Sequence, residues 1–411
     1  MTYGCIGEKL THSFSKEIHS KIADYDYELL ELAEDSLPEL LTSPKFRAIN
    51  VTIPYKEKVI PYLSYIDEGA QAIGAVNTVV NKGGKLYGYN TDFYGMSALI
   101  SRLGVDISGK KVVILGTGGT SKTALAVATH LGAKEVFRVS RRSGEGVITY
   151  DDLYKLHTDA QVIINTTPVG MYPKNNGLCV EIDKFPALSL CVDAVYNPLR
   201  TPFILEAMKR GIPAEGGLYM LVAQAVRASE IFLDTVYDAD TVDKIFKEIL
   251  SQKENVVLIG MPASGKSTVG KLLAERLERP LIDTDELVVS EAKMQIVDIF
   301  SSLGEEKFRD MESLAAARAA KSTSSVIATG GGAILRQKNV DFLRQNGKLF
   351  FIDRPLEALV PTDSRPLSNS RASIEKRYRE RYGIYCSTCD VKIDASCDAI
   401  GVCEKIIASL G

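Results

Sequence analysis

A segment in the middle of the chain has the residue types and spacing of a phosphate-binding loop. Residues 260–267 read Gly-Met-Pro-Ala-Ser-Gly-Lys-Ser, which matches the pattern G-x-x-x-x-G-K-[ST] of nucleoside-triphosphate enzymes. The loop follows an apolar run at 255–260, which predicts a buried parallel strand, and precedes residues 268–277, whose spacing predicts a helix. A chance glycine turn is the alternative, but the motif needs this strand–loop–helix context. The predicted nucleotide-binding residues are Gly260, Ser264, Gly265, Lys266, Ser267 and Thr268.

A second glycine-rich loop, Gly116-Thr-Gly-Gly-Thr-Ser121, follows another apolar run and opens a helical segment. Gly116 allows a tight turn, and Gly118 lets the backbone approach a pyrophosphate held by the helix N-terminus. Ser121 stands where a third glycine or alanine usually permits helix–strand contact. The sequence therefore predicts a dinucleotide site at Gly116, Gly118, Gly119, Thr120 and Ser121.

The end of the following strand candidate indicates which dinucleotide binds. It reads Arg138-Val-Ser-Arg-Arg-Ser143 and has no acidic residue placed to bind a free ribose 2′-hydroxyl. Arg141 and Arg142 suit a 2′-phosphate, so the sequence favours NADP(H) over NAD. A solvated basic turn is the alternative interpretation of these two arginines.

Length and composition limit the function classes. A chain of 411 residues suggests two or three domains, and 45% hydrophobic and 25% charged residues are typical of globular proteins. A net charge of −3 gives no electrostatic reason to expect nucleic acid or a membrane surface. There is no apolar run long enough to span a bilayer and no basic, apolar leader at the start. Seven dispersed cysteines fit reduced thiols in a cytoplasm.

Four of the cysteines have a spacing that could hold zinc: Cys386, Cys389, Cys397 and Cys403. Cys386 and Cys389 fall where a predicted helix ends and the strand candidate 391–393 begins. Small buried thiols are common at such junctions, and we favour that interpretation over a metal site.

Three blocks follow from the order of apolar runs and helical segments. We predict a domain at 1–97, a second at 98–245, a polar linker at 246–254 and a third domain at 255–411. Alternating strands and helices in the second block predict a parallel, doubly wound sheet, and the fold class is α/β throughout. Its strand candidates are residues 112–115, 135–140, 162–165 and 191–194.

The first block contains residues suited to proton transfer. Lys56 follows an extended, proline-bearing segment, and Asp92 ends the sequence Gly88-Tyr-Asn-Thr-Asp92. A hydride acceptor needs a general acid for its developing alkoxide, and a Lys–Asp pair provides one. The 36 residues between them leave open whether the two side chains meet.

Residues 1–245 resemble shikimate dehydrogenase. The resemblance rests on several segments in family order: 12–15 (His-Ser-Phe-Ser), 50–56, Asn77-Thr78, 90–92, 165–171, 193–198 and 220–224. It implies that Ser13 and Ser15 bind the substrate carboxylate, and that Lys56 and Asp92 are the catalytic pair. Further residues are implied to hold ring hydroxyls (Thr52, Asn77, Asp92 and Gln224) or to line the cofactor (Asn165, Thr166, Met171 and Gly217). Lys16 departs from the family, which usually has proline there.

In the third block, Asp283 and Asp285 follow a strand candidate. On a true strand, positions i and i+2 share one face, so one carboxylate could serve magnesium while the other meets an acceptor alcohol. An arginine-rich segment follows, which is typical of a mobile lid over phosphates, although a solvated helix face is the alternative for any one arginine. With Gly304–Glu312, 329–332, 364–367 and Arg381–Tyr385, the block resembles shikimate kinase over nearly all of 255–411.

This second resemblance implies a nucleoside-monophosphate-kinase-like P-loop domain that uses ATP and Mg²⁺. Lys266 would contact the transferred phosphoryl group, Ser267 and Asp283 would serve magnesium, and Arg365 would come from the lid. Phe300 and Phe308 would pack against the substrate ring. Shikimate would be held by Asp285, Arg309, Gly331, Gly332 and Arg381. The family commonly stacks an arginine on adenine, but residues 357–364 contain no basic residue.

Together the two resemblances imply a Rossmann dehydrogenase preceded by an α/β substrate domain and followed by a kinase. The chain would reduce 3-dehydroshikimate with NADPH and then phosphorylate shikimate with ATP. One rival hypothesis is a catalytically dead sensor, which the retained Lys56, Asp92 and Lys266 disfavour. Another is a quinate-directed dehydrogenase joined to a kinase of other specificity. The sequence does not indicate the oligomeric state.

Overall fold

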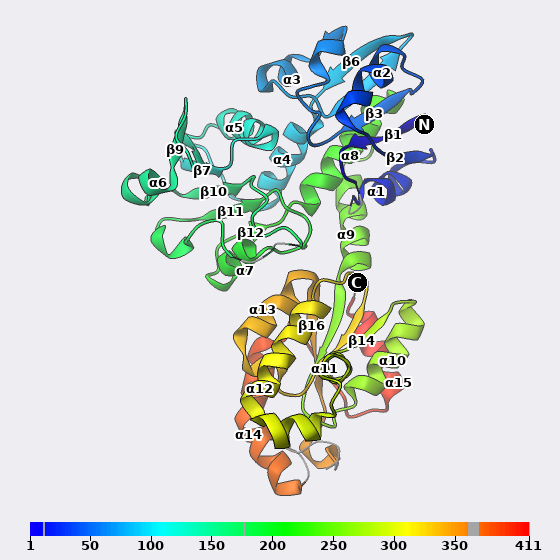
Figure 1. The fold of residues 1–411 in the computed structure, drawn as a ribbon, viewed down its shortest axis with the longest axis vertical. Helices are drawn as coiled ribbons and strands as arrows, with labels where there is room; N and C mark the ends of the chain where they lie inside the picture. Colours follow the sequence, from blue (N-terminus) through cyan, green and yellow to red (C-terminus); the bar gives the residue numbers. More distant parts are fainter. Residues whose placement is uncertain (11–12, 174, 176, 361–369, 411) are drawn as a thin grey trace. The chain divides into compact units, whose positions relative to one another are not determined.

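The structure, a computed structural model, describes residues 1–10, 13–173, 175, 177–360 and 370–410. The chain forms two compact units, Met1–Ile249 and Leu250–Gly411 (Figure 1). The segment expected to be a polar linker is instead mostly helical, because it lies within α9 (Thr241–Lys253). Phe246 and Ile249 are buried in this amphipathic helix, so its polar residues form an exposed face rather than a flexible connection.

The first sheet of unit 1 is mixed and has the strand order β2-β1-β3-β5-β6-β4. Its strands are β1 (Tyr3–Gly7), β2 (Tyr27–Glu31), β3 (Ala48–Val51), β4 (Tyr65–Ile66), β5 (Thr78–Lys82) and β6 (Lys85–Tyr89). The helices of this part are α1 (Ser15–Ile22), α2 (Leu37–Thr42), α3 (Glu68–Ile73) and α4 (Thr91–Arg102). Alternating residues of the central strands face two different cores, and the second of these cores includes Phe232 from a distant helix.

The second sheet of unit 1 is entirely parallel, with the order β12-β11-β10-β7-β8-β9. Its strands are β7 (Lys111–Leu115), β8 (Glu135–Ser140), β9 (Val147–Thr149), β10 (Val162–Asn165), β11 (Leu190–Asp193) and β12 (Ala214–Glu215). This is the doubly wound Rossmann order. All four strand predictions are confirmed to within one residue at each end. The chain reverses its direction of winding between β7 and β10, which is where such sheets bind ligands.

Five helices complete unit 1: α5 (Gly119–His130), α6 (Tyr150–Leu156), α7 (Pro202–Lys209), α8 (Leu218–Leu233) and α9. Helix α8 packs along α4, and the two backbones come close at Gly95, where a Cβ would lie 2.6 Å from the carbonyl oxygen of Met220. Only glycine permits this backbone contact. It brings the side chains of α8 to the start of α4, where Asp92 lies.

Unit 2 is a parallel five-stranded sheet with the order β14-β15-β13-β16-β17. Its strands are β13 (Asn255–Ile259), β14 (Leu281–Asp283), β15 (Val326–Ala328), β16 (Gly347–Asp353) and β17 (Val391–Asp394). Its helices are α10 (Lys266–Leu277), α11 (Thr284–Ala292), α12 (Ile296–Ala319), α13 (Gln337–Asn346), α14 (Arg371–Thr388) and α15 (Ala399–Ala408). The strand and helix predicted around the phosphate loop are therefore confirmed as β13 and α10.

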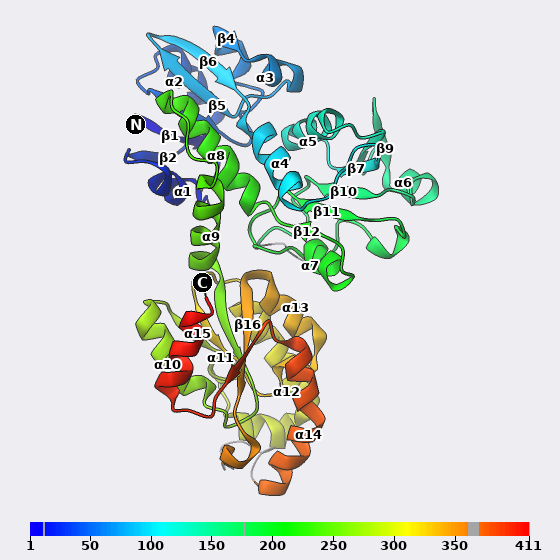
Figure 2. The ribbon, with the colours of Figure 1, turned by 180° about the vertical axis from the view of Figure 1, so that it is seen from behind.

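Helices cover both faces of this sheet. Figure 2 shows α10 and α15 on one face and α12, α13 and α14 on the other. The two cores agree with this arrangement, because one buries Leu273 and Ile406 and the other buries Leu343 and Tyr385. Within α12 the helix is broken at Gly304, whose φ of 83° and ψ of 167° are not helical.

The seven cysteines are all free. Cys386 and Cys389 lie at the end of α14 as predicted, but Cys386 is exposed rather than buried. Cys403 lies in the core beside α10. Among the described residues, no three His, Cys, Asp or Glu side chains are grouped as metal ligands. In the same part of the chain, every helix is too short or too polar to cross a bilayer.

Candidate active sites

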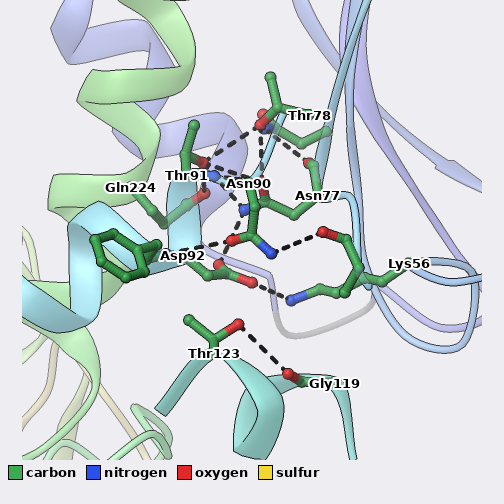
Figure 3. Close-up of polar contacts among 12 residues, drawn as sticks. Lys56, Asn77, Thr78, Asn90, Thr91, Asp92, Gly119, Thr123 and Gln224 are labelled. Carbon is green, nitrogen blue, oxygen red and sulfur yellow. Dashed lines mark hydrogen bonds and ion pairs between the residues drawn. The ribbon is translucent and has the colours of Figure 1, made fainter. Parts of the chain in front are cut away.

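The structure brings Lys56 and Asp92 together. Lys56 lies in the loop after β3, Asp92 lies in the first turn of α4, and Lys56 Nζ donates to Asp92 Oδ2 at 2.5 Å (Figure 3). The side chains of Lys56 and Asp92 are 16% and 9% exposed. A mostly buried but still accessible ammonium–carboxylate pair is suited to proton transfer with a bound molecule. Cys5 is buried near this pair, and burial raises the pKa of its thiol to about 12, so it stays protonated.

The second oxygen of Asp92 is fixed by Asn77. Asn77 Nδ2 donates to Asp92 Oδ1 at 2.9 Å, and Asn77 Oδ1 accepts the backbone N–H of Thr91 at 2.7 Å (Figure 3). Asn90 caps α4 by accepting the N–H of Phe93. This cap fixes the start of the helix and so places Asp92 in its first turn, beside Lys56. The carboxylate is therefore oriented by Lys56 and by Asn77, which directly precedes β5, at the capped start of α4.

A buried polar network lies behind these residues. Tyr27 donates to Asn50 Oδ1 at 2.6 Å, and Asn50 Nδ2 donates to Thr78 Oγ1 at 3.1 Å. Thr78 in turn donates to Asn77 Oδ1 at 3.1 Å. The sequence interpretation gave Tyr27 and Asn50 no role. Asn50 stands in the segment 50–56, but hydrogen bonding between strands β2, β3 and β5 could not be foreseen from spacing.

Gln224 on α8 reaches the same site. Its Oε1 accepts a hydrogen bond from Thr91 at 3.3 Å, and its side chain is buried because α8 approaches α4 at Gly95 (Figure 3). This placement is consistent with the prediction that Gln224 belongs to the first site, although it lies 132 positions after Asp92 in the sequence.

Ser13 and Ser15 form a local pair at the start of α1. Ser13 Oγ donates to Ser15 Oγ at 3.1 Å, and Ser15 is buried as the first residue of the helix. Lys16, at the next position, is exposed, so its departure from the family pattern is accommodated. Thr52 follows β3 and is half-buried. His12 lies outside the described residues.

The dinucleotide loop has the backbone that its glycines predict. Gly116 has a φ of 112°, and a Cβ there would lie 2.7 Å from Thr166 Oγ1. A Cβ at Gly118 would meet no atom within 4 Å, so the loop is open on that side. Ser121 is buried and donates to the carbonyl of Gly116 at 2.7 Å, which closes the turn in place of a third glycine. Gly119 begins α5 and lies beside Lys56 (Figure 3).

Asn165 is placed differently from Thr166 and Met171. It is fully buried, its Nδ2 donates to Asp193 Oδ1 at 3.0 Å, and its Oδ1 accepts from Thr167. Its side chain therefore supports the loop after β10 rather than facing a ligand. Burial raises the pKa of Asp193 to about 6, despite hydrogen bonds from Thr201, Val195 and Asn165.

The remaining cofactor residues lie at the edge of the loop region. Met171 is 43% exposed, and Arg141 and Arg142 are exposed just after β8. Thr120 is half-buried in the first turn of α5. Gly217 begins α8, where a Cβ would lie 2.2 Å from the carbonyl oxygen of Ala194. The exposed guanidinium groups and the open backbone at Gly118 fit a dinucleotide carrying a 2′-phosphate.

In unit 2 the phosphate loop joins β13 to α10. Gly260, Ala263 and Gly265 have φ values of 154°, 64° and 91°. Positive φ values of this kind let successive loop N–H groups form an anion-binding concavity. Lys266 is buried and its Nζ donates to the carbonyls of Gly260 and Met261 at 2.8 and 2.9 Å. Ser264 is buried, and Thr268 is exposed in the first turn of α10.

Ser267 and Asp283 form the second part of this site. Ser267 Oγ donates to Asp283 Oδ2 at 2.9 Å. A hydroxyl and a carboxylate are hard oxygen donors, so the pair fits Mg²⁺. The predicted shared strand face of Asp283 and Asp285 is wrong. Strand β14 ends at Asp283, whose Oδ1 caps α11 by accepting the N–H of Asp285 at 2.9 Å, so Asp285 is helical.

The second set of predicted substrate residues gathers around Arg309. Arg309 Nη1 donates to Glu312 at 2.8 Å, and a Cβ on Gly332 would lie 2.0 Å from that nitrogen. Glu312, which received no predicted role, is buried, and burial raises its pKa even beside Arg309. Arg381 donates to the carbonyl of Gly331 at 3.1 Å.

Two further features border this cluster. A Cβ on Gly330 would lie 2.5 Å from Asp285 Oδ1 and 2.8 Å from Glu312 Oε1, so Asp285 lies at the same place. Phe300 and Phe308 have ring centroids 4.7 Å apart on the two sides of the break at Gly304. Arg365, predicted to come from the lid, lies outside the described residues.

Comparisons with known proteins identify both halves. Residues 5–79 match the shikimate dehydrogenase substrate binding domain, and residues 262–411 match the shikimate kinase family. The NADP⁺-dependent shikimate dehydrogenase of Clostridium perfringens (strain SM101) is 39% identical over 265 residues, covering 60% of this chain and 97% of that protein. The chain belongs to the shikimate dehydrogenase family. Its C-terminal part is a shikimate kinase domain.

Solved structures agree with this assignment. Shikimate dehydrogenase 1 from Peptoclostridium difficile is 35% identical, with a TM-score of 0.56 over 60% of this chain and 97% of that one. A chorismate mutase/shikimate 5-dehydrogenase fusion from Clostridium acetobutylicum is 38% identical, with a TM-score of 0.57 and coverage of 60% and 96%. The resemblance of both halves and the predicted fold class are therefore confirmed.

Proposed function

We propose that this chain catalyses two consecutive reactions: reduction of 3-dehydroshikimate by NADPH, and phosphorylation of the resulting shikimate by ATP. The observation that carries the proposal is that one chain contains a dehydrogenase half and a kinase half whose families name the same compound. The Lys56–Asp92 contact and the intact phosphate loop support activity in both halves and disfavour a catalytically dead sensor.

In the dehydrogenase half, Lys56 is the proton donor. Bound NADPH supplies the hydride that reduces the ketone. As negative charge develops on the ketone oxygen, Lys56 Nζ donates a hydrogen bond and then a proton to it. Asp92 holds the ammonium through Oδ2 and is itself oriented by Asn77 at Oδ1. Oxidation of shikimate runs through the same groups in reverse, with Lys56 accepting the proton.

The other residues of this half would select the substrate. Ser13 and Ser15 would bind its carboxylate with two hydroxyl groups. Asn77, just before β5, lies beside Asp92 on α4, and Gln224 reaches the same site from α8. Their amide and carboxylate groups suit ring hydroxyls. Such groups are left unpaired by an analogue without the hydroxyl, which gives strong discrimination. Arg141 and Arg142 would favour NADPH through its 2′-phosphate.

In the kinase half, Ser267 and Asp283 would hold Mg²⁺, which neutralises charge on the phosphates when bound. Lys266 would exchange its contacts with loop carbonyls for oxygens of the transferred phosphoryl group. Asp285 would orient the attacking hydroxyl and take up its proton, as a positioned carboxylate does in other kinases. Arg309 and Arg381 would bind the substrate carboxylate, and Glu312 would hold the Arg309 guanidinium in place.

One experiment tests both activities. Purified protein is incubated with shikimate, and NADP⁺ reduction and ATP-dependent ADP release are measured in separate reactions, with quinate as the competing substrate. We expect both signals with shikimate and much weaker ones with quinate. Absence of both signals would support the sensor hypothesis, and a preference for quinate would support the quinate-directed alternative. We also propose a cytoplasmic location, which the seven free cysteines support.

A further inference from the structure

Arg354 lies beside the phosphate loop of the kinase half, and none of the roles above includes it. It directly follows β16, which pairs in register with β13, Phe351 opposite Ile259. Strand β16 continues two residues beyond the end of β13, and a Cβ on Gly260 would lie 2.9 Å from the carbonyl oxygen of Ile352. The chain thus leaves β16 at the edge of the sheet where the loop binds phosphate.

The guanidinium of Arg354 is directed toward the loop. A Cβ on Gly265 would lie 3.9 Å from Arg354 Nη1, and it would meet no other atom within 4 Å. The arginine is half-buried and anchored, because its N–H donates to Ile352 at 3.1 Å and its Nε donates to the carbonyl of Ala358 at 3.4 Å. Pro355 further restricts its backbone to extended conformations.

Among the described residues, no carboxylate balances the charge of Arg354. Other arginines of this unit form ion pairs, such as Arg318 with Glu291 and Arg336 with Asp310. In the described part of the chain, no carboxylate lies within ion-pair distance of Arg354. Partial burial of a cation is unfavourable unless an anion compensates it, and the adjacent loop is built to hold an anion.

We infer that Arg354 binds the phosphate chain of the nucleotide in the kinase site. The inference rests on the proposed function, because it assigns a further ligand of the same site. A guanidinium is always charged and can offer two parallel N–H groups to phosphate oxygens. Arg354 would act on ATP and ADP alike and on every base, since its ligand is the phosphate chain.

The test compares R354Q with R354K and with R318Q, which removes an exposed arginine from the same unit. Binding of ADP and of GDP is measured by titration calorimetry with magnesium on the full chain. We expect R354Q to weaken both nucleotides by the same factor, about tenfold or more, R354K to weaken them less, and R318Q to have no effect. Dehydrogenase turnover and shikimate binding on the same samples show that both units are folded.

Two outcomes of the R354Q titrations overturn the assignment. Unchanged affinity in R354Q would show that Arg354 does not contact nucleotide. A loss confined to ADP would show that it contacts the adenine rather than the phosphates. If the wild type binds nucleotide but phosphorylates no shikimate, the proposed function fails, whereas the ADP and GDP titrations still decide the role of Arg354. Loss of shikimate binding in R354Q would leave the decision to the milder R354K, whose unchanged affinities would refute the assignment.

Discussion

Asn77 donates to Asp92 Oδ1 at 2.9 Å, on the oxygen that Lys56 does not use. The carboxylate is thus held from two sides, and the Lys56 ammonium is held in turn by the carboxylate. These contacts give the two residues of the pair different roles. Asp92 fixes a position, and Lys56 has the group that can give up a proton to a ketone.

We predict that Lys56→Ala removes most dehydrogenase turnover and leaves kinase turnover near the wild-type value. Loss of a positioned general acid typically lowers the rate about 10²–10⁴-fold. Steady-state kcat is measured for both reactions on one preparation, and Lys266→Met is the reciprocal variant, expected to lose only the kinase. A dehydrogenase kcat within threefold of wild type in Lys56→Ala would refute the role of Lys56.

The network behind the site should contribute to stability more than to rate. Tyr27→Phe leaves Asn50 Oδ1 buried without its donor, which typically costs about 1–3 kcal/mol. We expect the urea concentration that halves dehydrogenase activity to fall, while kcat without urea changes little, because Asn77 and Lys56 still hold Asp92. Tyr87→Phe is the matched control, a half-buried tyrosine of the same sheet. Equal urea resistance in Tyr27→Phe and wild type would contradict this prediction.

Asp193 should make unit 1 more stable at moderately acidic pH. Its pKa is about 6 in the folded protein because burial disfavours the charged form, against an ordinary 3.8. Between these values the folded state binds the extra proton, so stability falls as pH rises from about 4 to about 6 and stays low above that. The difference corresponds to at most about 3 kcal/mol.

Asp193→Asn removes this titration and keeps an oxygen for Val195 and Asn165. We expect the variant to be less sensitive to pH between 4 and 6 than the wild type, and at least as stable at pH 8. Thermal midpoints of dehydrogenase inactivation across this range provide the measurement, and the kinase unit serves as an internal reference. Parallel pH profiles for the two proteins would show that the pKa of Asp193 is not raised.

The elements that depend on short-range signals could be predicted from the sequence. The two glycine loops and the strands beside them were predictable, because a strand, a glycine turn and a helix start lie within some 20 residues. Long-range contacts required the structure. Gly95 gave no sign that its missing Cβ lets α8 bring Gln224 to Thr91 in the first site. Nor could the sequence show that Arg354, three residues before the segment 357–364, lies beside the phosphate loop.

Two local predictions missed a helix. Asp285 was expected to continue β14, but capping of α11 by Asp283 ended the strand two residues earlier. The boundary between the two units falls inside the polar segment 246–254 that was expected to be a linker, but most of this segment is helical, because its few apolar residues have helical spacing and are buried in α9. In both places, polar residues near a helix resembled strand or linker sequence.

Arg141 and Arg142 should set the cofactor preference. In the double variant Arg141→Ala/Arg142→Ala, we expect kcat/KM for NADP⁺ to fall more than tenfold and the value for NAD⁺ to stay within about threefold, because only the 2′-phosphate loses its charged partners. Arg227→Ala, on the exposed face of α8, is the control. An equal loss with both cofactors would mean that the arginines act on the fold rather than on the 2′-phosphate.

The kinase half should tolerate GTP in place of ATP. No basic residue occurs between 357 and 364, so adenine lacks the stacked arginine common in the family, a contact worth roughly 0.5–2 kcal/mol. Lys266, and Arg354 as inferred above, act on phosphates and do not depend on the base. We therefore expect kcat/KM with GTP to be within about tenfold of that with ATP, measured at fixed shikimate and magnesium. Discrimination above a hundredfold would mean that other residues recognise the adenine.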